Sequence, residues 1–296
     1  MIGREQIATL ARECGFGDVA DDLAALALPS LRLEYVDAPA AVGASKLGGL
    51  PDLPSDMRWP HAKWAGYEHE AMTFFGQIAL ADLDAAVWKG PRDGLLSFFC
   101  RQSPDYFGVD VGGAARVLHL PAGAVLDRRE PPSALFDYFR LGECAVSARP
   151  EMTLPTIAVD VADVLEPLGF GWDGPRAEQD DDYDALELRL AEAQGFSPRR
   201  PDGSWAERHR LLGWPRHVQG DVLLEIVLMH FRDNQIEYTT ADLGRHAADW
   251  RLLLQIESDR RLGASFGDGG TLFFGMPAAE LEAARFDLVQ AISQSS

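Results

Sequence analysis

The segment SKLGGLPDLP, residues 45–54, has the composition of a loop that binds an anion. Two adjacent glycines, Gly48 and Gly49, can expose their backbone N–H groups, and Lys46 adds a positive charge beside Ser45. The GxxxxGK[ST] pattern of a Walker loop is absent. The prolines fix the backbone and remove donors, which favours a rigid turn. An anion site and a structural loop with an incidental charge are therefore both open interpretations.

Two glutamines, Gln77 and Gln255, lie inside strand-like runs of Phe, Leu and Ile. A buried amide needs hydrogen-bond partners, because leaving it unsatisfied costs about 1–3 kcal/mol. In the structural interpretation, which we favour, each amide binds the backbone of the Gly/Pro loop in its own half of the chain. In the functional interpretation, the two amides line a pocket between the halves.

The other polar motifs give no positive reason to propose a metal, a cofactor or a catalytic residue. The GDGG segment, with Asp268 and Gly270, lacks the alternating oxygen ligands of a calcium loop and is typical of a hairpin turn. The histidines have no HxxxH or HExxH spacing, and there is no GxSxG motif or recognisable cysteine nucleophile. We therefore expect no metal and no cofactor, and a binding protein rather than an enzyme.

Both helices and strands are predicted to position these residues. Apolar residues at helical spacing predict two short helices before residue 30, one after the acidic tract 180–182 and one over 279–292. Strand-like runs occupy residues 31–36, 72–80, 94–100, 154–161 and 250–258. Residues 220–231 fit a helix or a strand by periodicity alone.

The same series of motifs occurs twice along the chain. A loop with Gly and Pro (LGGLP, LLGWP) precedes an apolar strand with Gln-Ile, an Asp-Gly turn and a strand with Phe-Phe. We predict an internal duplication, with one half over 1–150 and the other over 151–296, packed as one compact unit. The predicted helices are expected at the periphery of this unit. The structural residues of the motifs are Pro51, Trp59, Pro60, Gly94, Gly213, Pro215, Asp268 and Gly270.

The chain is acidic, with a formal net charge of −19 over 296 residues. Residues 1–150 carry −6 and residues 151–296 carry −13. This charge disfavours binding to nucleic acid and to anionic membranes. It is explained either by solubility or by the attraction of a basic protein partner. No apolar run approaches the roughly 20 residues that span a bilayer, and the N-terminus lacks the apolar core of a signal peptide. With three scattered cysteines, we expect a cytoplasmic protein.

Six motifs together resemble the successive signatures of the YwqG-like bacterial proteins, a family of unknown function. They are SKLGGLPDLPSDMRWP, FFGQIAL, GLLSFF, HRLLGWPRHVQGD, LLLQIESD and FGDGGTLFFG, within residues 45–100 and 205–290. One departure is Phe266, where a tryptophan often precedes the final Gly-Asp-X-Gly. The resemblance implies an α+β fold with a duplicated, largely antiparallel β core and no established activity. Some relatives sit among bacterial toxin and immunity systems, which makes a partner-binding role conceivable.

Three functional hypotheses follow. The first is a non-catalytic protein-binding factor of immunity or regulatory type. The alternative is a small-ligand-binding protein, or an enzyme, with a pocket between the halves that involves Lys46, Gln77 or Gln255. Self-association through the halves is the third.

Overall fold

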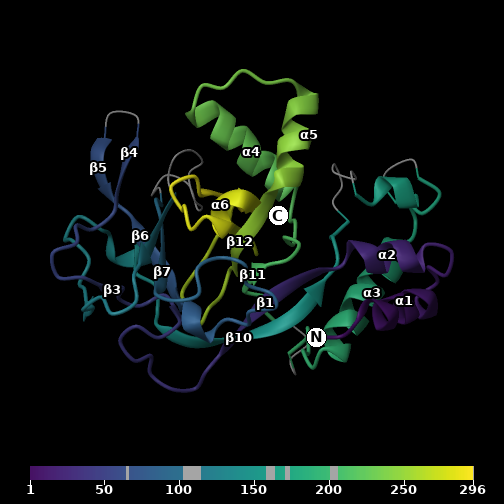
Figure 1. Cartoon of the computed structure of the whole chain (residues 1–296), viewed down its shortest axis with the longest axis horizontal. Coiled ribbons are helices and arrows are strands. Elements are labelled where there is room, and N and C mark those ends of the chain that lie inside the picture. The colour runs from purple at the N-terminus through teal and green to yellow at the C-terminus, as the bar shows by residue number, and fades with distance from the viewer. Residues whose placement is uncertain (65–66, 103–114, 158–163, 171–173, 201–205, 296) are drawn as a thin grey trace.

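The computed structural model describes residues 1–64, 67–102, 115–157, 164–170, 174–200 and 206–295. Within this part of the chain, ten strands form one antiparallel sheet in the order β14-β13-β12-β11-β1-β10-β2-β6-β7-β8 (Figure 1). They are β1 (Leu28–Tyr35), β2 (Lys46–Leu47), β6 (Thr73–Ala79), β7 (Leu95–Cys100), β8 (Ala115–Leu120), β10 (Cys144–Thr153), β11 (Arg210–Leu212), β12 (Trp250–Glu257), β13 (Thr271–Pro277) and β14 (Gln290–Gln294). One arm of the sheet extends from β10 and the other from β1, so these two long strands form its centre.

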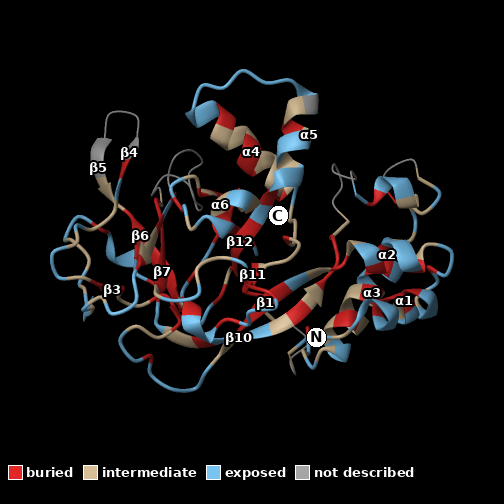
Figure 2. Cartoon of the chain, viewed as in Figure 1, coloured by how far each residue is buried: buried red, intermediate tan, exposed pale blue. Residues whose placement is uncertain are grey.

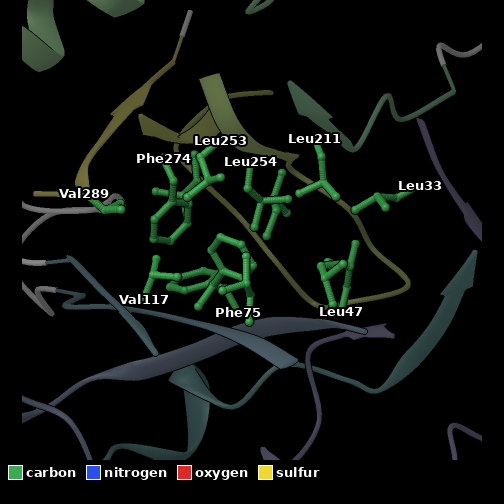
Figure 3. Packing of buried hydrophobic residues seen from close by; sticks show 14 of the residues in the cluster. Leu33, Leu47, Phe75, Val117, Leu211, Leu253, Leu254, Phe274 and Val289 are labelled. Atoms are coloured by element: carbon green, nitrogen blue, oxygen red, sulfur yellow. The ribbon is translucent and has the colours of Figure 1, made fainter. Parts of the chain in front are cut away.

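The sheet curves until its edge strands, β14 and β8, lie against each other. Buried apolar side chains from both arms meet inside the curve, as Figure 3 shows for Phe75 and Val117 facing Leu254 and Phe274. The ring centroids of Phe98 and Phe274, one from each arm, are 5.5 Å apart. The arms therefore share one apolar core. The division at residue 150 stays a prediction, and β10 runs across it.

Three helices pack together beside the ends of β1 and β10. They are α1 (Arg4–Glu13), α2 (Ala20–Leu26) and α3 (Asp180–Ala193), and they surround their own apolar cluster (Figure 2). The rings of Phe16, Phe170 and Tyr183 form its centre, with centroids 5.1 to 6.0 Å apart. The charged faces of these helices are exposed, while α3 contacts this cluster on one side and lines a cavity with β1, β10 and β11 on another.

The other helices cover the arm that extends from β1. They are α4 (Val222–Asp233), α5 (Thr240–Asp249) and α6 (Ala278–Glu282). The carboxylate of Asp221 caps α4 by accepting from two backbone N–H groups, and Thr239 with Asp242 forms a capping box on α5. Buried Ile226 and Val227 of α4 join the apolar cluster above β12–β14.

Two small ribbons complete the described structure on the opposite arm. One pairs β3 (Asp52–Leu53) with β9 (Asp127–Arg128), and the other pairs β4 (His61–Trp64) with β5 (Tyr67–Ala71). The register of the first places Arg128 directly opposite Asp52.

The α+β class and the antiparallel sheet are confirmed, as are the N-terminal helices and the strands at 31–36, 72–80, 94–100 and 250–258. The helix through Leu186 and Leu190 is also confirmed, but it begins at Asp180 and so includes the acidic tract that was expected to precede it. Residues 220–231 fall largely in α4. The predicted helix over 279–292 is wrong, because α6 ends at Glu282 and Ala284 adopts a left-handed φ of 57°. Residues 290–294 instead form β14, which pairs with the edge of β13. The predicted strand over 154–161 is also wrong at 154–157, and 158–161 lie outside the described residues.

Candidate functional site

Gln77 is fully buried on β6 and binds the backbone on both sides of the loop at residues 45–51. Its Oε1 accepts a hydrogen bond from the backbone N–H of Asp52 (3.0 Å), and its Nε2 donates to the carbonyl of Ala44 (2.9 Å). Nε2 also lies 2.6 Å from Oδ2 of Asp52. These are the contacts that the structural interpretation of Gln77 requires.

Gln255, buried on β12, makes the corresponding contacts in the other half. Its Oε1 accepts from the backbone N–H of Arg216 (2.9 Å), and its Nε2 donates to the carbonyl of Arg208 (3.2 Å). Arg208 and Arg216 follow Ala44 and Asp52 in the sequence by 164 residues each. The two glutamines therefore hold loops of equal length by the same backbone groups.

The two loops also have the same backbone turn. Gly48 and Gly49 have φ angles of 62° and 73°, while Leu212 and Gly213 have φ angles of 61° and 75°. A Cβ on Gly48 would overlap the carbonyl of Gly142, so a side chain cannot be accommodated there. The N–H of Gly48 donates to Phe75 O (2.9 Å) and that of Gly49 to Leu141 O (3.0 Å). Because protein carbonyls already accept from both N–H groups, they do not point at a common ligand position.

The charge of Lys46 is neutralised inside the protein. Its Nζ, fully buried, lies 3.1 Å from Glu143 Oε2 and 3.5 Å from Asp52 Oδ1. Arg128 also contacts Asp52 Oδ1, at 3.2 Å, and the N–H of Gly43 donates to Oδ2 at 2.9 Å. Burial opposes ionisation of Asp52, but these hydrogen bonds and cations lower the pKa of its carboxyl. The contacts of Lys46 favour a structural role over ligand binding.

Ser45 and His209 occupy corresponding positions beside these loops. Ser45 Oγ accepts from the backbone N–H of Ala79 (2.9 Å), and His209 Nδ1 accepts from that of Glu257 (3.2 Å). His209 Nε2 is 3.1 Å from Asp259 Oδ2, which also accepts from the hydroxyl of Tyr35. Although burial opposes it, hydrogen bonding from His209 and Tyr35 lowers the pKa of Asp259 to about 2. His209 and Asp259 are both at most 4% exposed and Tyr35 is half-buried, so this cluster links β1 to the residue that precedes β11, largely away from solvent.

The remaining structural residues of the first half hold its turns and loops in place. Trp59 Nε1 donates to Met72 O (2.9 Å), and the carbonyls of Pro60 and Pro51 accept from Met72 and Arg129. The carbonyl of Gly94 accepts from Leu80 at 3.0 Å.

In the second half, the carbonyl of Gly270 likewise accepts from Ser258, at 2.8 Å. Gly213 lies so close to Thr153 that a Cβ would be 2.6 Å from its Oγ1. Pro215 directly precedes the Arg216 N–H that Gln255 binds, and Asp268 lies in the turn before β13.

A row of arginines crosses the centre of the sheet. Arg32 on β1 is directly opposite both Arg149 on β10 and Arg210 on β11. Like charges in such positions repel, so they need compensating groups. Arg32 has them, because Glu151 Oε2 (2.8 Å) and Glu34 Oε1 (2.7 Å) accept from its guanidinium. Within the described chain, however, neither Arg210 Nε nor Glu151 Oε1 has a hydrogen-bond partner, and the two buried atoms are 3.9 Å apart.

Arg210 lines a cavity of about 30 Å³ between α3 and strands β1, β10 and β11, which we call the arginine cavity. Its charged lining consists of Arg32, Arg208, Arg210, Arg216, Glu151 and Glu187. A second cavity of about 590 Å³, the carboxylate cavity, shares Thr156, Glu187 and Arg216 with the first. Its other titratable lining consists of Asp184, Glu207, Glu257 and His217. The second volume falls within the range of about 300–1,000 Å³ typical of small-molecule sites.

Burial perturbs the titratable groups around these cavities. It raises the pKa of Glu187 against the opposing effect of Arg208 and Arg216, and it raises the pKa of Asp184. Burial, followed by the charge of Arg216, lowers the pKa of Arg208. Perturbed groups gathered at a cavity are typical of binding and catalytic sites.

Residues 45–294 match the family described as "Domain of unknown function (DUF1963)". The chain belongs to this family. The match contains both loops and both glutamines, with Arg208, Arg210 and Arg216 of the arginine cavity. Arg32 and the rest of β1 precede it, although β1 is a central strand of the sheet. No curated protein matches the chain.

Sequence reasoning missed the arginine cavity, which the DUF1963 domain forms together with Arg32. The available signal was the spacing of Arg208 and Arg210, two residues apart, which in an extended segment places two like charges on the same side. The pairing with Arg32, almost 180 residues earlier, follows only from the topology of the sheet. In the described parts of the chain, no helix is long and apolar enough to cross a membrane. Nor do three or more His, Cys, Asp or Glu side chains there come together in a group that could hold a metal ion.

Proposed function

We propose that this chain binds a small molecule with an anionic group, held in the arginine cavity. The observation that carries the proposal is the pair of buried atoms without hydrogen-bond partners in the described chain, Arg210 Nε and Glu151 Oε1. A buried polar atom without a hydrogen bond costs about 1–3 kcal/mol, and more when its group is charged, so these two atoms require an explanation. A bound oxyanion would accept from the guanidinium of Arg210, as carboxylates and phosphates do in general.

The corresponding position in the other half supports this proposal by contrast. Lys46 on β2 lies opposite Gln77, as Arg210 on β11 lies opposite Gln255. Lys46 faces Asp52, whereas the corresponding position in the second half holds Arg216, a second cation. In the first half the segment itself supplies the carboxylate that pairs with the cation. In the second half it supplies Arg216 instead, whose carboxylate partner at 3.6 Å, Glu257, lies on β12.

A thermal-shift screen of small metabolites with at least one carboxylate or phosphate tests the proposal. A ligand at 100 times its Kd stabilises the folded state by about 2.7 kcal/mol, which raises Tm by roughly 5 °C in a domain of this size. We expect Arg210→Gln to abolish the shift and Arg149→Gln to leave it intact. Arg149 is a matched control because it belongs to the same row but is 68% exposed as a side chain. Shifts equal in both variants, or none with any compound, would overturn the proposal.

We also infer that the two halves arose by duplication and that the chain is a YwqG-like, cytoplasmic bacterial protein. The equal spacing of the loop contacts, the paired φ angles and the matching Gly94 and Gly270 carbonyl bonds support the duplication. The free thiols of Cys14, Cys100 and Cys144 support a reducing compartment. A circular-permutation or half-chain expression experiment would test whether either half folds alone.

A basic protein partner is the second candidate function, favoured by the surface above α4, α5 and α6. A cavity of about 890 Å³ there is lined by four carboxylates and one arginine, from Glu237, Asp242, Asp249, Glu282 and Arg251. Ile236 and Tyr238 are exposed within or beside it, at 41% and 43%. A pull-down should recover a stoichiometric basic protein that salt releases, and Asp249→Lys should weaken capture while Asp182→Lys does not. Equal capture by both variants would exclude this surface.

A further inference from the structure

The charges around the two adjoining cavities are unevenly distributed. The charged side chains of the arginine cavity are four arginines and two glutamates. Those of the carboxylate cavity are four carboxylates and one arginine, with His217 beside them. A ligand that occupies both cavities therefore meets positive charge at one end and negative charge at the other.

Two carboxylates of the second cavity are suited to receive a cation. Asp184 and Glu187 lie three residues apart on α3, so their side chains are neighbours on one face of the helix. Neither makes a hydrogen bond, or an ion pair within 4 Å, to another residue of the described chain. The first of the two is exposed and the second half-buried, so a ligand can reach them from solvent. Burial raises the pKa of both, a shift that a bound cation would reverse.

The size of the arginine cavity limits which anionic group of a ligand can enter it. A volume of about 30 Å³ accommodates two or three water-sized groups, since each needs roughly 10–15 Å³. A carboxylate has three heavy atoms, whereas a phosphate has five and carries a second negative charge. Arg210 Nε faces Glu151 Oε1 at this end, which further disfavours a dianion.

We propose that the ligand is a small zwitterion of the amino-acid class, with its carboxylate at Arg210 and its ammonium group at Glu187 and Asp184. This inference rests on the proposed function, because it adds a second charged group to the anionic ligand of the arginine cavity. The carboxylate accepts hydrogen bonds from a guanidinium, and the ammonium group donates to two carboxylates, so each end meets the opposite charge.

Isothermal titration calorimetry with simple probes tests the zwitterion directly. The probes are the common L-amino acids, β-alanine and γ-aminobutyrate, with succinate, acetate and inorganic phosphate as anions that lack an ammonium group. We expect at least one zwitterion to bind, and its N-acetyl and carboxamide derivatives to bind about 10- to 100-fold more weakly, because each loses one charge-assisted contact.

Variants of α3 assign the ammonium end. Glu187→Gln keeps the shape of the side chain and should weaken the zwitterion about tenfold or more, while the binding of an anion-only probe is unchanged or improved. Asp182→Asn, on an exposed position of the same helix outside both cavities, should change neither. Circular dichroism confirms that each variant is folded.

The outcomes separate this inference from the proposed function. If succinate or phosphate binds in an Arg210-dependent way and no zwitterion does, the zwitterion is refuted and the anion site stands. If zwitterions bind equally well to the wild type and to Glu187→Gln, the ammonium end is wrongly assigned. If no probe or metabolite shows binding that depends on Arg210, both proposals fail.

Discussion

Lys46 and Arg210 occupy corresponding positions in the two halves, and replacing each by methionine should have unequal effects on stability. Lys46→Met removes a buried ammonium group from between Asp52 and Glu143. Removing one partner of a buried ion pair costs about 3–5 kcal/mol, because the other charge is left uncompensated. Asp52 keeps Arg128, Gln77 and the N–H of Gly43 as partners, so we expect a cost at or just below the lower end of that range, about 2–3 kcal/mol.

Arg210→Met should cost less than about 1 kcal/mol or be neutral. Its carboxylate neighbour, Glu151, keeps the bond from Arg32 at 2.8 Å, and the Nε that would be lost has no hydrogen-bond partner in the described chain. Loss of the like-charge repulsion from Arg32 also offsets the loss of the guanidinium.

Urea unfolding followed by tryptophan fluorescence measures both costs by linear extrapolation, with equal m-values required for a valid comparison. We expect a large decrease in the free energy of unfolding for Lys46→Met and a small one for Arg210→Met. A cost for Arg210→Met equal to or above that for Lys46→Met would refute the assignment of one cation to structure and the other to binding.

Three further predictions test the structural contacts. Asp259→Asn should lower the free energy of unfolding by about 2 kcal/mol at pH 7, since a pKa lowered from 3.8 to about 2 corresponds to roughly this amount. This stabilisation is present above the pKa of Asp259 in the unfolded chain and is lost as the pH falls through its pKa in the folded chain. The difference in free energy of unfolding between variant and wild type should therefore shrink between pH 4 and pH 2. A difference that stays constant over this range would contradict the prediction. Gly48→Ala should lower the urea midpoint of unfolding more than Gly123→Ala does. Both glycines have positive φ, but only at Gly48 would a Cβ meet another residue. Equal midpoints for the two variants would argue against the close approach of Gly48 to Gly142. Gln255→Leu should lower the free energy of unfolding by about 1–3 kcal/mol, because it leaves the Arg216 N–H and the Arg208 carbonyl unsatisfied. Gln77→Leu should lower it by a similar amount. No change in thermal unfolding would show that water replaces the amide.

The sequence predicted elements whose signals are local. The strands around Gln77 and Gln255 and the helix that carries Leu186 and Leu190 have periodic apolar residues, and burial on one side is enough to determine them. The C-terminal segment was predicted wrongly because Leu281, Leu288 and Ile292 fit a helical stripe. The edge of β13 offers backbone partners to residues 290–294, and this pairing determines the structure there.

The arginine cavity could not be predicted from local signals, because its residues come from distant segments. Arg32 and Arg210 become neighbours only when β1 pairs with β11, and Glu187 reaches them only through the packing of α3. The local signal pointed instead to Lys46, because its glycine-rich surroundings are typical of an anion site. Two carboxylates near Lys46 in space, one of them 97 positions away in the sequence, account for its charge.

The central position of β1 has a consequence for synthesis on the ribosome. Among the described strands, β1 pairs only with β10 and β11, and the first of these begins 109 residues after β1 ends. At about 5–20 residues per second, β1 waits roughly 5–20 s for a partner. During that time both of its edges are unpaired and Leu31 and Leu33 have no core to enter. The nascent chain therefore presents residues 28–35 as a transient binding site for chaperones, well before the sheet can close.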